Sequence, residues 1–313
     1  TFLVNGAERV IVSQLHRSPG VFFGQSRHAN GTKLYSARVI PFKGSWIEFT
    51  TDIRDVLWAY IDRKKKLPAT TLLRALGYAS DKEILELFNL SEEVAVSSKK
   101  AFTEFIGRIL ATDIVQEEMV EVVDDETGEV KEAVQRNILI ERDKVLEEDD
   151  YAAIKEAGIK KLLLVKTDSD SDQKPKKGHL KGLSDRTVLF QTLKKDPSYD
   201  EESALGEVYR QIRTGEMPDK ETARTVLERL FFSDKKYDLG QVGRYRLNKR
   251  LHVDVDLETL HLTKDDIVAI IEEVINLKQM NAQVDDIDHL SNRRVRTVGE
   301  QLGQQFAIGL ARM

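Results

Sequence analysis

Strand patterns and helix patterns occupy separate parts of this 313-residue chain, and this separation restricts the folds that it can adopt. Alternating, β-branched and aromatic runs dominate residues 1 to 62, at 33–41, 46–50 and 56–62. Helical patterns dominate the later part. Because strands and helices do not alternate regularly, a doubly wound parallel sheet is disfavoured, and the sequence predicts an α+β fold.

The later helices are predicted from capping residues and apolar spacing. Ser80 and Glu83 form a capping box, and Thr263 and Asp266 cap a helix with a continuous apolar stripe. Predicted helices cover 70–76, 84–88, 97–110, 144–157, 186–193, 202–213, 220–232, 263–277 and 298–313.

One short segment near the start combines a strand with a forced bend. Asn5-Gly6 predicts a hairpin turn, and the strand pattern of 8–17 follows it. Ser18-Pro19-Gly20 then makes the chain extend and reverse, because proline disfavours helix in the residue before it and glycine admits positive φ. We expect Arg17 to lie at the end of a rigid element. The alternative is an ordinary strand with a surface turn.

The middle of the chain has the composition of an insertion. A charged hairpin is predicted from 119–123 and 129–130, which flank an Asp-Asp-Glu-Thr-Gly turn. A buried strand is predicted at 162–165. The charged segment 167–182 has the composition of a flexible linker, so we expect an internal boundary there.

Composition excludes several classes of function. The chain has no cysteine, which rules out disulfides and thiolate metal sites and fits a reducing compartment. A net charge of −5 argues against coating DNA through bulk positive charge, so any nucleic-acid contact must be local. Without a long apolar run or a secretory leader, we expect a cytoplasmic protein with no membrane contact. Both termini look cut, which suggests a portion of a larger protein.

Common enzyme motifs are missing from the sequence, with one tempting exception. No nucleophile elbow, Walker loop or dinucleotide-binding turn is present. The acidic segment 285–289 could bind a divalent cation, as a metal-dependent hydrolase would need. The alternative is an ion-pair network with Arg293, Arg294 and Arg296, which is favoured because three acids and three bases nearly cancel.

Four separated stretches, in the same order, resemble the β subunit of bacterial multisubunit RNA polymerase. Four motifs in register are far more specific than any one of them. They are residues 8–23, 44–46, 61–70 and 284–296.

This resemblance implies an arrangement of domains and partners. Residues 1–20 and 280–313 would pack together as part of the protrusion, and 21–279 would form the lobe, with a lineage-variable insert at about 95–190. The chain would enclose DNA in the main cleft of a nucleoid-associated enzyme. Its partners would be the non-template strand and downstream duplex, the β′, α and σ subunits, and transcription factors that bind the lobe. No catalytic residue or cofactor is expected in this chain, because the carboxylates that hold Mg²⁺ belong to β′.

The resemblance also assigns a base-binding role to the acidic segment. Asp288 and Arg293 match residues that hold a flipped base of the non-template strand near the downstream edge of the transcription bubble. By the same resemblance Arg17 would lie beside them, and Ile287 would supply an apolar wall. A carboxylate accepts from base N–H groups and a guanidinium donates to base acceptors, and guanine presents both.

Further positions are implied to follow the path of single-stranded DNA. Trp46, after the Gly44-Ser45 turn, would stack on an unpaired base; the alternative is a core tryptophan. Asp62 and Arg63 would extend that path. Arg213 stabilises a predicted helix C-terminus and is implied to face DNA as well.

A separate group is implied to border the path of nascent RNA and the rifamycin pocket: Arg9, Val12 and Gln14. One departure from the family is Ser291, where glycine is common, so the turn before Arg293 is expected to differ. A rival function is a protein-interaction module that docks transcription factors or phage regulators through the lobe and its insert.

Overall fold

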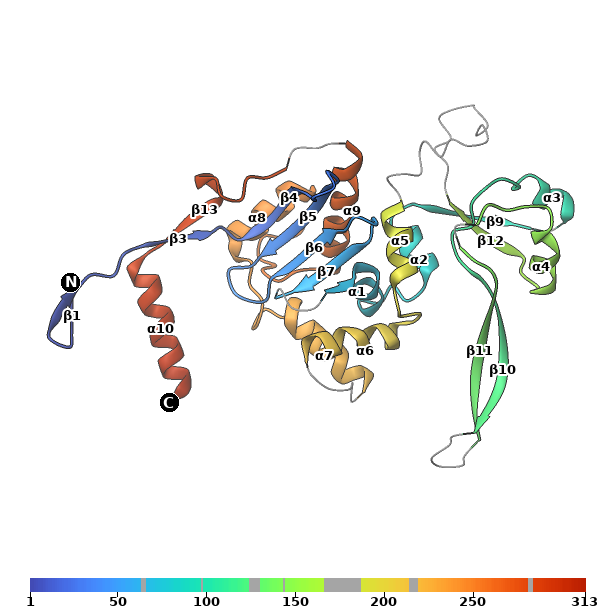
Figure 1. Cartoon of the computed structure of the whole chain (residues 1–313). Helices are drawn as coiled ribbons and strands as arrows, with labels where there is room; N and C mark the ends of the chain where they lie inside the picture. Colours follow the sequence, from blue (N-terminus) through green and yellow to red (C-terminus); the bar gives the residue numbers. More distant parts are fainter. Residues whose placement is uncertain are drawn as a thin grey trace. The chain divides into compact units, whose positions relative to one another are not determined.

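The computed structural model describes residues 1–62, 66–96, 98–123, 130–142, 144–165, 187–213, 219–280 and 284–313. The chain is a mixture of helices and small sheets, which confirms the predicted class (Figure 1). It divides into two compact units. Unit 1 contains 1–53, 58–67 and 208–313, and unit 2 contains 54–57 and 68–207. The predicted division into protrusion and lobe stays a prediction.

Unit 1 is built around a five-stranded sheet whose strands follow one another in chain order. Successive pairs among the first three strands are antiparallel, and Ala37 lies opposite both Phe23 and Phe49. These three side chains are fully buried, so one face of the sheet forms the core. The strands are β4 (Gly20–Arg27), β5 (Lys33–Ile40), β6 (Ile47–Thr51), β7 (Leu57–Ile61) and β8 (Lys66–Pro68).

Two helices cover this sheet. Helix α8 (Gly240–Leu251) packs on β4, and α9 (Lys264–Met280) packs on β5 and on α8. The predicted cap of α9 is confirmed, because Thr263 N–H donates to Asp266 Oδ2 at 2.7 Å and Asp266 N–H donates to Thr263 Oγ1 at 3.1 Å. The predicted stripe of α9 is fully buried at Ile267, Ile270, Ile271 and Val274. Helix α7 (Lys220–Phe231) precedes them in the chain.

A fully buried ion pair joins α8 to the start of α9. Arg244 Nη1 lies 2.9 and 2.8 Å from the two carboxylate oxygens of Asp266, and neither side chain is exposed. The other guanidinium donors reach main-chain oxygens, with Nε of Arg244 2.7 Å from Thr259 O and Nη2 bonded to His261 O. A buried charge is tolerated only when it is paired and hydrogen-bonded, and here the pairing fixes α8 on α9.

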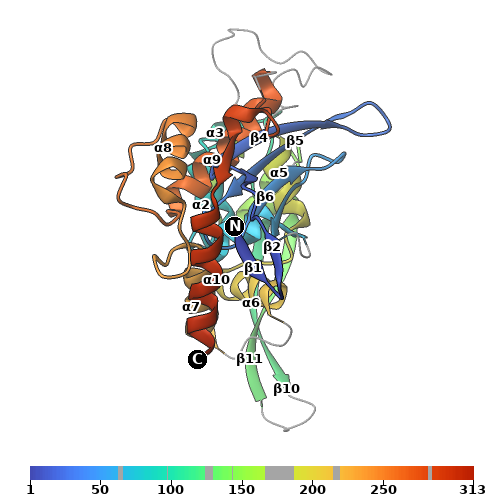
Figure 2. The ribbon, with the colours of Figure 1, turned by 90° about the vertical axis from the view of Figure 1, so that its left-hand side faces the viewer.

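Segments near the two ends of the chain pair with each other (Figure 1), and Figure 2 views the molecule from the side of β1 and α10. Strand β3 (Gln14–Arg17) pairs antiparallel with β13 (Arg293–Arg296), and α10 (Val298–Arg312) follows β13. The predicted hairpin at the start is confirmed as β1 (Phe2–Val4) and β2 (Ala7–Arg9). Its turn residues, Asn5 and Gly6, have φ of 51° and 76°.

The prediction of one continuous strand over 8–17 is wrong. Residues 10–13 are in neither strand, so the segment is split into β2 and β3. Val10 and Val12 are exposed, and no described strand pairs with this stretch. An alternating pattern alone does not make a strand without a neighbour to complete its hydrogen bonds.

Unit 2 combines a helical part with a separate β-containing module. The predicted capping box at the start of α2 is confirmed, with Glu83 N–H donating to Ser80 Oγ at 3.2 Å. The helices of this part are α1 (Ala69–Ala75), α2 (Asp81–Leu87), α5 (Thr187–Lys195) and α6 (Glu201–Ile212), whose last turn falls in unit 1.

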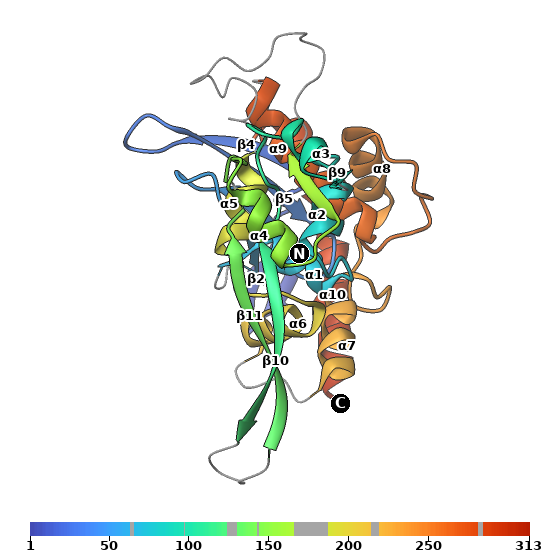
Figure 3. The ribbon, with the colours of Figure 1, turned by 90° about the vertical axis from the view of Figure 1, so that its right-hand side faces the viewer.

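The module of unit 2 carries a long two-stranded hairpin (Figure 3). The predicted hairpin is confirmed, and its register runs from Ile114 opposite Ile140 to Val123 opposite Val130. The predicted turn after 123 and the predicted linker 167–182 lie outside the described residues. The elements are β9 (Ser91–Ala95), α3 (Lys99–Thr103), β10 (Ile114–Val123), β11 (Val130–Ile140), α4 (Asp150–Glu156) and β12 (Lys161–Val165).

Two predicted helices in the module are much shorter than expected. Helix 97–110 is reduced to α3, because Gly107 has φ of 89° and the chain after it pairs with the segment around Leu146. Gly107 N–H donates to Leu146 O at 2.9 Å, and Leu146 N–H donates to Arg108 O at 2.8 Å. The same pairing keeps 144–149 out of a helix, so only α4 forms. Phe102 and Leu110 still share one core, as predicted, but through an irregular backbone.

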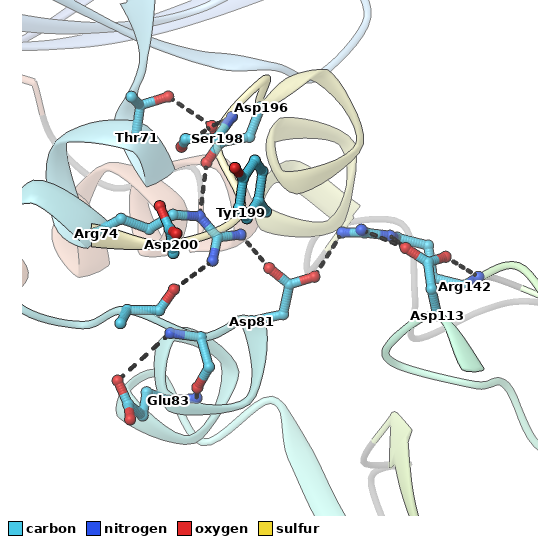
Figure 4. Close-up of polar contacts among 12 residues, drawn as sticks. Thr71, Arg74, Asp81, Glu83, Asp113, Arg142, Asp196, Ser198, Tyr199 and Asp200 are labelled. Carbon is cyan, nitrogen blue, oxygen red and sulfur yellow. Dashed lines mark hydrogen bonds and ion pairs between the residues drawn. The ribbon is translucent and has the colours of Figure 1, made fainter. Parts of the chain in front are cut away.

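A chain of alternating charges connects the helical part of unit 2 to the base of the hairpin (Figure 4). Arg74 is almost fully buried and donates from Nε to Asp196 Oδ2 at 3.1 Å, and it also pairs with Asp81. Asp81 Oδ2 lies 2.9 Å from Arg142 Nη1, and Arg142 Nε donates to Asp113 at 2.8 Å. Five charged groups therefore form one continuous network.

We predict that Asp196→Ala destabilises the chain by about 3 kcal/mol. The substitution removes the carboxylate that accepts from Nε of Arg74, and this nitrogen stays buried without that partner. Urea unfolding followed by circular dichroism would measure this change. Lys82→Ala is the control, since its pairs with Glu86 and Glu93 are on the surface, where solvent screens them and they contribute little to stability. Equal losses in the two variants would show that the buried network does not stabilise unit 2.

The sequence predicts no membrane contact, and the helices of the structure can be compared with this prediction. Among the described residues, no helix combines the length and the apolar character needed to cross a bilayer.

Candidate nucleic-acid interface

The pairing of β3 with β13 brings together residues from opposite ends of the chain. Arg17 lies directly opposite Arg293 in the register, and His16 lies opposite Arg294. Because directly opposite residues share a face of an antiparallel ribbon, both members of the first pair project on one side and both members of the second on the other. The ladder continues through Ser18, whose N–H donates to Asn292 O at 2.9 Å.

Asp288 lies between the two arginines, so the structure brings three predicted site residues together. Its Oδ1 lies 3.2 Å from Arg293 Nη2 and 3.9 Å from Arg17 Nη2. The Asp288 side chain is 65% exposed, whereas the arginines are 31% and 34% exposed. We call Arg17, Asp288 and Arg293 the charged triad. Ile287, the predicted apolar wall, is half-buried next to it in the chain.

The charged triad has unused hydrogen-bonding capacity. The two arginines approach the Asp288 carboxylate at Oδ1, and Oδ2 accepts no hydrogen bond from a described residue. The guanidinium of Arg17 donates no hydrogen bond within the described part of the chain, and Nε of Arg293 also has no partner there. The acceptor Oδ2 of Asp288 and the donors of Arg17 are therefore left over near each other, whereas Nε of Arg293 is buried.

The acidic segment before the triad is tied to the sheet. Asp285 Oδ2 accepts from Phe23 N–H at 2.8 Å, and Asp285 N–H donates to Phe23 O at 2.8 Å, as a strand partner of β4 would. Arg250 lies 3.7 Å from the same carboxylate, and its guanidinium is 4.5 Å from the centre of the Phe23 ring. Sequence reasoning missed this anchoring role of Asp285, because its partners are more than 30 positions away.

The predicted ion-pair network is confirmed for only one of the three arginines. Arg293 pairs with Asp288, but Arg294 and Arg296 lie near Glu300 instead, at 2.5 and 3.7 Å. The acids of the segment have different partners, and Asp286 Oδ1 accepts from Asp288 N–H at 3.0 Å. Within the described ranges, no three histidine, aspartate or glutamate residues are grouped to hold a metal ion.

The turn before β13 is regular despite its serine. Leu290–Asn292 form the 3₁₀ helix η1, and Ser291 is not among the residues with positive φ. Serine is accommodated here without strain, because Ser291 does not occupy the left-handed region that glycine favours. The expectation that the turn differs from that of the family stays a prediction. Arg246 of α8 donates to Ser291 O at 2.6 Å and to Asn292 Oδ1 at 3.3 Å, a support that the sequence did not indicate.

Trp46 and Asp62 form a second local arrangement. Trp46 N–H donates to Asp62 Oδ1 at 2.8 Å, and Asp62 N–H donates to Trp46 O at 2.9 Å. Asp62 has φ of 49°, and the side chain of Trp46 is half-buried rather than enclosed in the core. The Asp62 carboxylate thus supports the backbone that presents the indole. Arg63 lies outside the described residues.

Gly44, in the loop before Trp46, is required by close packing. Its φ is 131°, and a Cβ atom there would lie 2.8 Å from Cδ2 of Tyr237. The Tyr237 ring is fully buried, and burial raises the pKa of its hydroxyl. The Gly-Ser-Trp motif therefore reflects a tight contact as well as the presentation of an aromatic ring.

The remaining predicted positions are exposed. Arg9 pairs with Phe2 in the hairpin, Gln14 contacts His16 in β3, and the main-chain oxygen of Val12 accepts from Gln301 at 3.1 Å. The prediction that they border RNA stays a prediction. Arg213 follows the end of α6, as expected, and its N–H donates to Tyr209 O at 2.8 Å.

Comparison with known proteins identifies the family. A family model described as RNA polymerase Rpb2, domain 2, matches residues 17–139 and 183–296. The DNA-directed RNA polymerase subunit beta of Flavobacterium psychrophilum is 55% identical over all 313 residues, that of Christiangramia forsetii 56% and that of Phocaeicola vulgatus 55%. The chain spans 24% of the length of each of these relatives.

The chain therefore belongs to the RNA polymerase Rpb2 domain 2 family. Its whole length is homologous to bacterial RNA polymerase β subunits, which confirms the resemblance inferred from the four motifs.

The stability of the junction between β13 and α10 is expected to depend on pH. Hydrogen bonds from Arg294, and the charges of Arg294, Arg296 and His16, hold the pKa of Glu300 below its ordinary value of 4.5. A carboxyl with a lowered pKa stabilises the folded state fully above pH 4.5, and this contribution is lost as the pH falls through the lower folded pKa.

We predict that Glu300→Gln lowers the melting temperature of the chain at pH 7 and that this difference shrinks as the pH falls below about 4.5. Thermal unfolding of both proteins from pH 7 to pH 3 would measure it. Glu272→Gln, at an exposed position of α9, is the matched control and should show little difference at any pH. A difference for Glu300→Gln that is constant across this range would contradict the prediction.

Proposed function

We propose that this chain is the portion of a DNA-directed RNA polymerase β subunit that encloses DNA in the main cleft and contacts the non-template strand near the downstream edge of the transcription bubble. Family membership supports a role within the polymerase and on DNA. In this proposal the chain works in the cytoplasm with β′, α and σ subunits and forms no bond itself. The Mg²⁺ of the enzyme would be held by β′, and this chain needs no cofactor.

The observation that carries the proposal is the unused hydrogen-bonding capacity of the charged triad. A structural ion pair would normally satisfy its own donors and acceptors, yet Arg17 donates to no described residue and Asp288 Oδ2 accepts from none. The carboxylate is exposed, so an incoming group can reach it without displacing a buried contact.

An unpaired guanine matches these groups. The free carboxylate oxygen would accept from the N–H groups of the Watson–Crick edge, and the guanidinium groups would donate to O6 and N7. Adenine and the pyrimidines each lack part of this combination. A base that is already unpaired in the bubble also avoids most of the cost of leaving a duplex stack.

Trp46 would supply a surface on which another unpaired base of the non-template DNA strand stacks. A half-buried indole whose backbone is fixed on both sides by Asp62 loses little freedom when a base stacks on it. Stacking does not read sequence, because every base has an aromatic face. Asp62, Arg63 and Arg213 would continue the DNA path, and Arg9, Val12 and Gln14 would border the RNA.

We predict that Arg293→Ala in the assembled polymerase reduces the preference for guanine at one non-template position by about tenfold, since a good pair of base contacts contributes about 1–3 kcal/mol of discrimination. Asp288→Asn should do the same, because an amide has one oxygen and one NH2 group, so it cannot face the arginines with one oxygen and accept from guanine with a second. Competition binding with bubble DNAs that differ only at that position would measure the preference.

Arg294→Gln is the matched control for this prediction. It removes one guanidinium from the adjacent position of β13, on the other side of the ribbon. Affinity for all bubbles should fall together, with the guanine preference unchanged. If Arg293→Ala behaves like Arg294→Gln, the base-reading role is wrong, and the rival reading of a protein-docking surface gains support.

We also predict that Trp46→Ala weakens binding of bubble DNA by the assembled polymerase by about 5- to 150-fold, as expected for loss of 1–3 kcal/mol of stacking. Trp46→Phe keeps an aromatic face and should lose much less. Fluorescence anisotropy of labelled bubble DNA would provide both affinities. Equal losses for the two variants would indicate that the indole does not stack on a base.

A further inference from the structure

We propose that Arg246 is a positioning residue, which holds the two strands of the candidate site in the register that places Arg17 opposite Arg293. This inference rests on the proposed function, because it concerns the residue that keeps the charged triad in place. Arg246 itself is not assigned a contact with DNA. Its contacts with the turns on both sides of the β3–β13 ribbon carry the argument.

The guanidinium of Arg246 is bonded to the turn before β13. Nη2 donates to Ser291 O at 2.6 Å, and Nη1 donates to Asn292 Oδ1 at 3.3 Å. Asn292 in turn donates from Nδ2 to Asp286 O at 2.7 Å. One side chain of α8 therefore fixes η1 and, through Asn292, the segment that carries Asp288.

The aliphatic stem of Arg246 contacts the turn after β3. Gly20 has φ of 136°, and a Cβ atom at that position would lie 3.4 Å from Cβ and 3.7 Å from Cδ of Arg246. One turn away, Gly243 leaves room for Pro19, whose Cβ would be 3.0 Å from an added Cβ. The bend that ends β3 therefore rests on the same face of α8.

The two turns that Arg246 supports are joined directly by a hydrogen bond of the β3–β13 ladder. Ser18 N–H donates to Asn292 O, so the residue after Arg17 is bonded to the residue before Arg293. Arg246 donates to the side chain of Asn292, the acceptor residue of this bond, and its stem lies beside Gly20, two residues after Ser18. A slip of either strand by one residue would turn its side chains to the other face and would separate the charged triad.

The charge of Arg246 is not used to pair with an acid. Its guanidinium donates to a main-chain oxygen and an amide oxygen, and no carboxylate of a described residue lies within ion-pair distance. The planar fork with several donors is what this position requires, which lysine supplies only in part. Arg246 therefore acts through the direction of its hydrogen bonds and not through an ion pair. The helix that carries it is fixed by the buried Arg244–Asp266 pair.

The test uses polymerase assembled with a full-length β subunit that carries the variants, and it has two readouts. Hydrogen exchange followed by mass spectrometry reports the stability of peptides that cover 14–18 and 290–296. Competition between bubble DNAs reports the guanine preference. We expect Arg246→Ala to increase exchange in both peptides at least tenfold and to lower the guanine preference about as much as Arg293→Ala does.

Two further variants make the result specific. Arg246→Lys keeps the stem against Gly20 and one donor, so both readouts should be intermediate. Lys249→Ala removes a cation from the exposed side of the same helix and should leave both readouts unchanged. If Arg246→Ala does not assemble, the lysine variant still decides, because wild-type behaviour in both readouts would overturn the proposal.

The outcomes separate this inference from the proposed function. Unchanged exchange in Arg246→Ala overturns the positioning role. Faster exchange with an intact guanine preference also overturns it, since the residue would then stabilise the fold without setting the site. If Arg293→Ala leaves the preference intact, the proposed function fails, while the exchange data alone still decide whether Arg246 holds the register.

Discussion

The buried ion pair between Arg244 and Asp266 is the interaction on which the candidate site depends. Nη1 of Arg244 bonds to Asp266, the other guanidinium nitrogens bond to main-chain oxygens, and the same carboxylate caps α9. Breaking one partner of such a pair is costly, because the remaining charge is buried without compensation. Helix α8 is thereby held in one position and orientation against α9 and β4.

From this fixed helix the site is built outward in layers. Gly243 and Arg246 support the two turns that flank the ribbon, and Arg250 with Asp285 ties the acidic segment to β4. The residues that face solvent, Arg17 and Asp288, make few contacts of their own. Such an order is typical of binding sites, in which the groups that meet a ligand are left unsatisfied and the groups behind them are not.

Much of the sheet and its caps could be predicted from the sequence, because local signals determine them. Alternation identified β5 and β6, and the Thr263–Asp266 cap located the start of α9. Helix α8 was missed, because its buried face consists of Gly243, Arg244 and Leu247, and a pattern that counts arginine as exposed finds no stripe there.

Long-range partners explain the other differences. Strand β9 has the sequence Ser-Glu-Glu-Val-Ala, which favours no strand by itself and forms one only by pairing with β12. The grouping of Arg17 with Asp288 and Arg293 followed from family resemblance, since no local pattern connects positions so far apart. Arg246 had no sequence signal, because an arginine in a basic helix looks like ordinary surface charge.

The pairing of β3 with β13 also has a consequence for synthesis of the chain. Its two strands are separated by nearly the whole sequence, so β3 leaves the ribosome long before its partner exists. At about 5–20 residues per second, the interval is roughly 15 to 55 seconds. During that time β3, with its exposed Leu15, has no neighbouring strand, and the exposed Val10 and Val12 lie just before it. The charged triad would thus be among the last parts of this chain to form, and nascent chains would be prone to associate through the unpaired edge of β3.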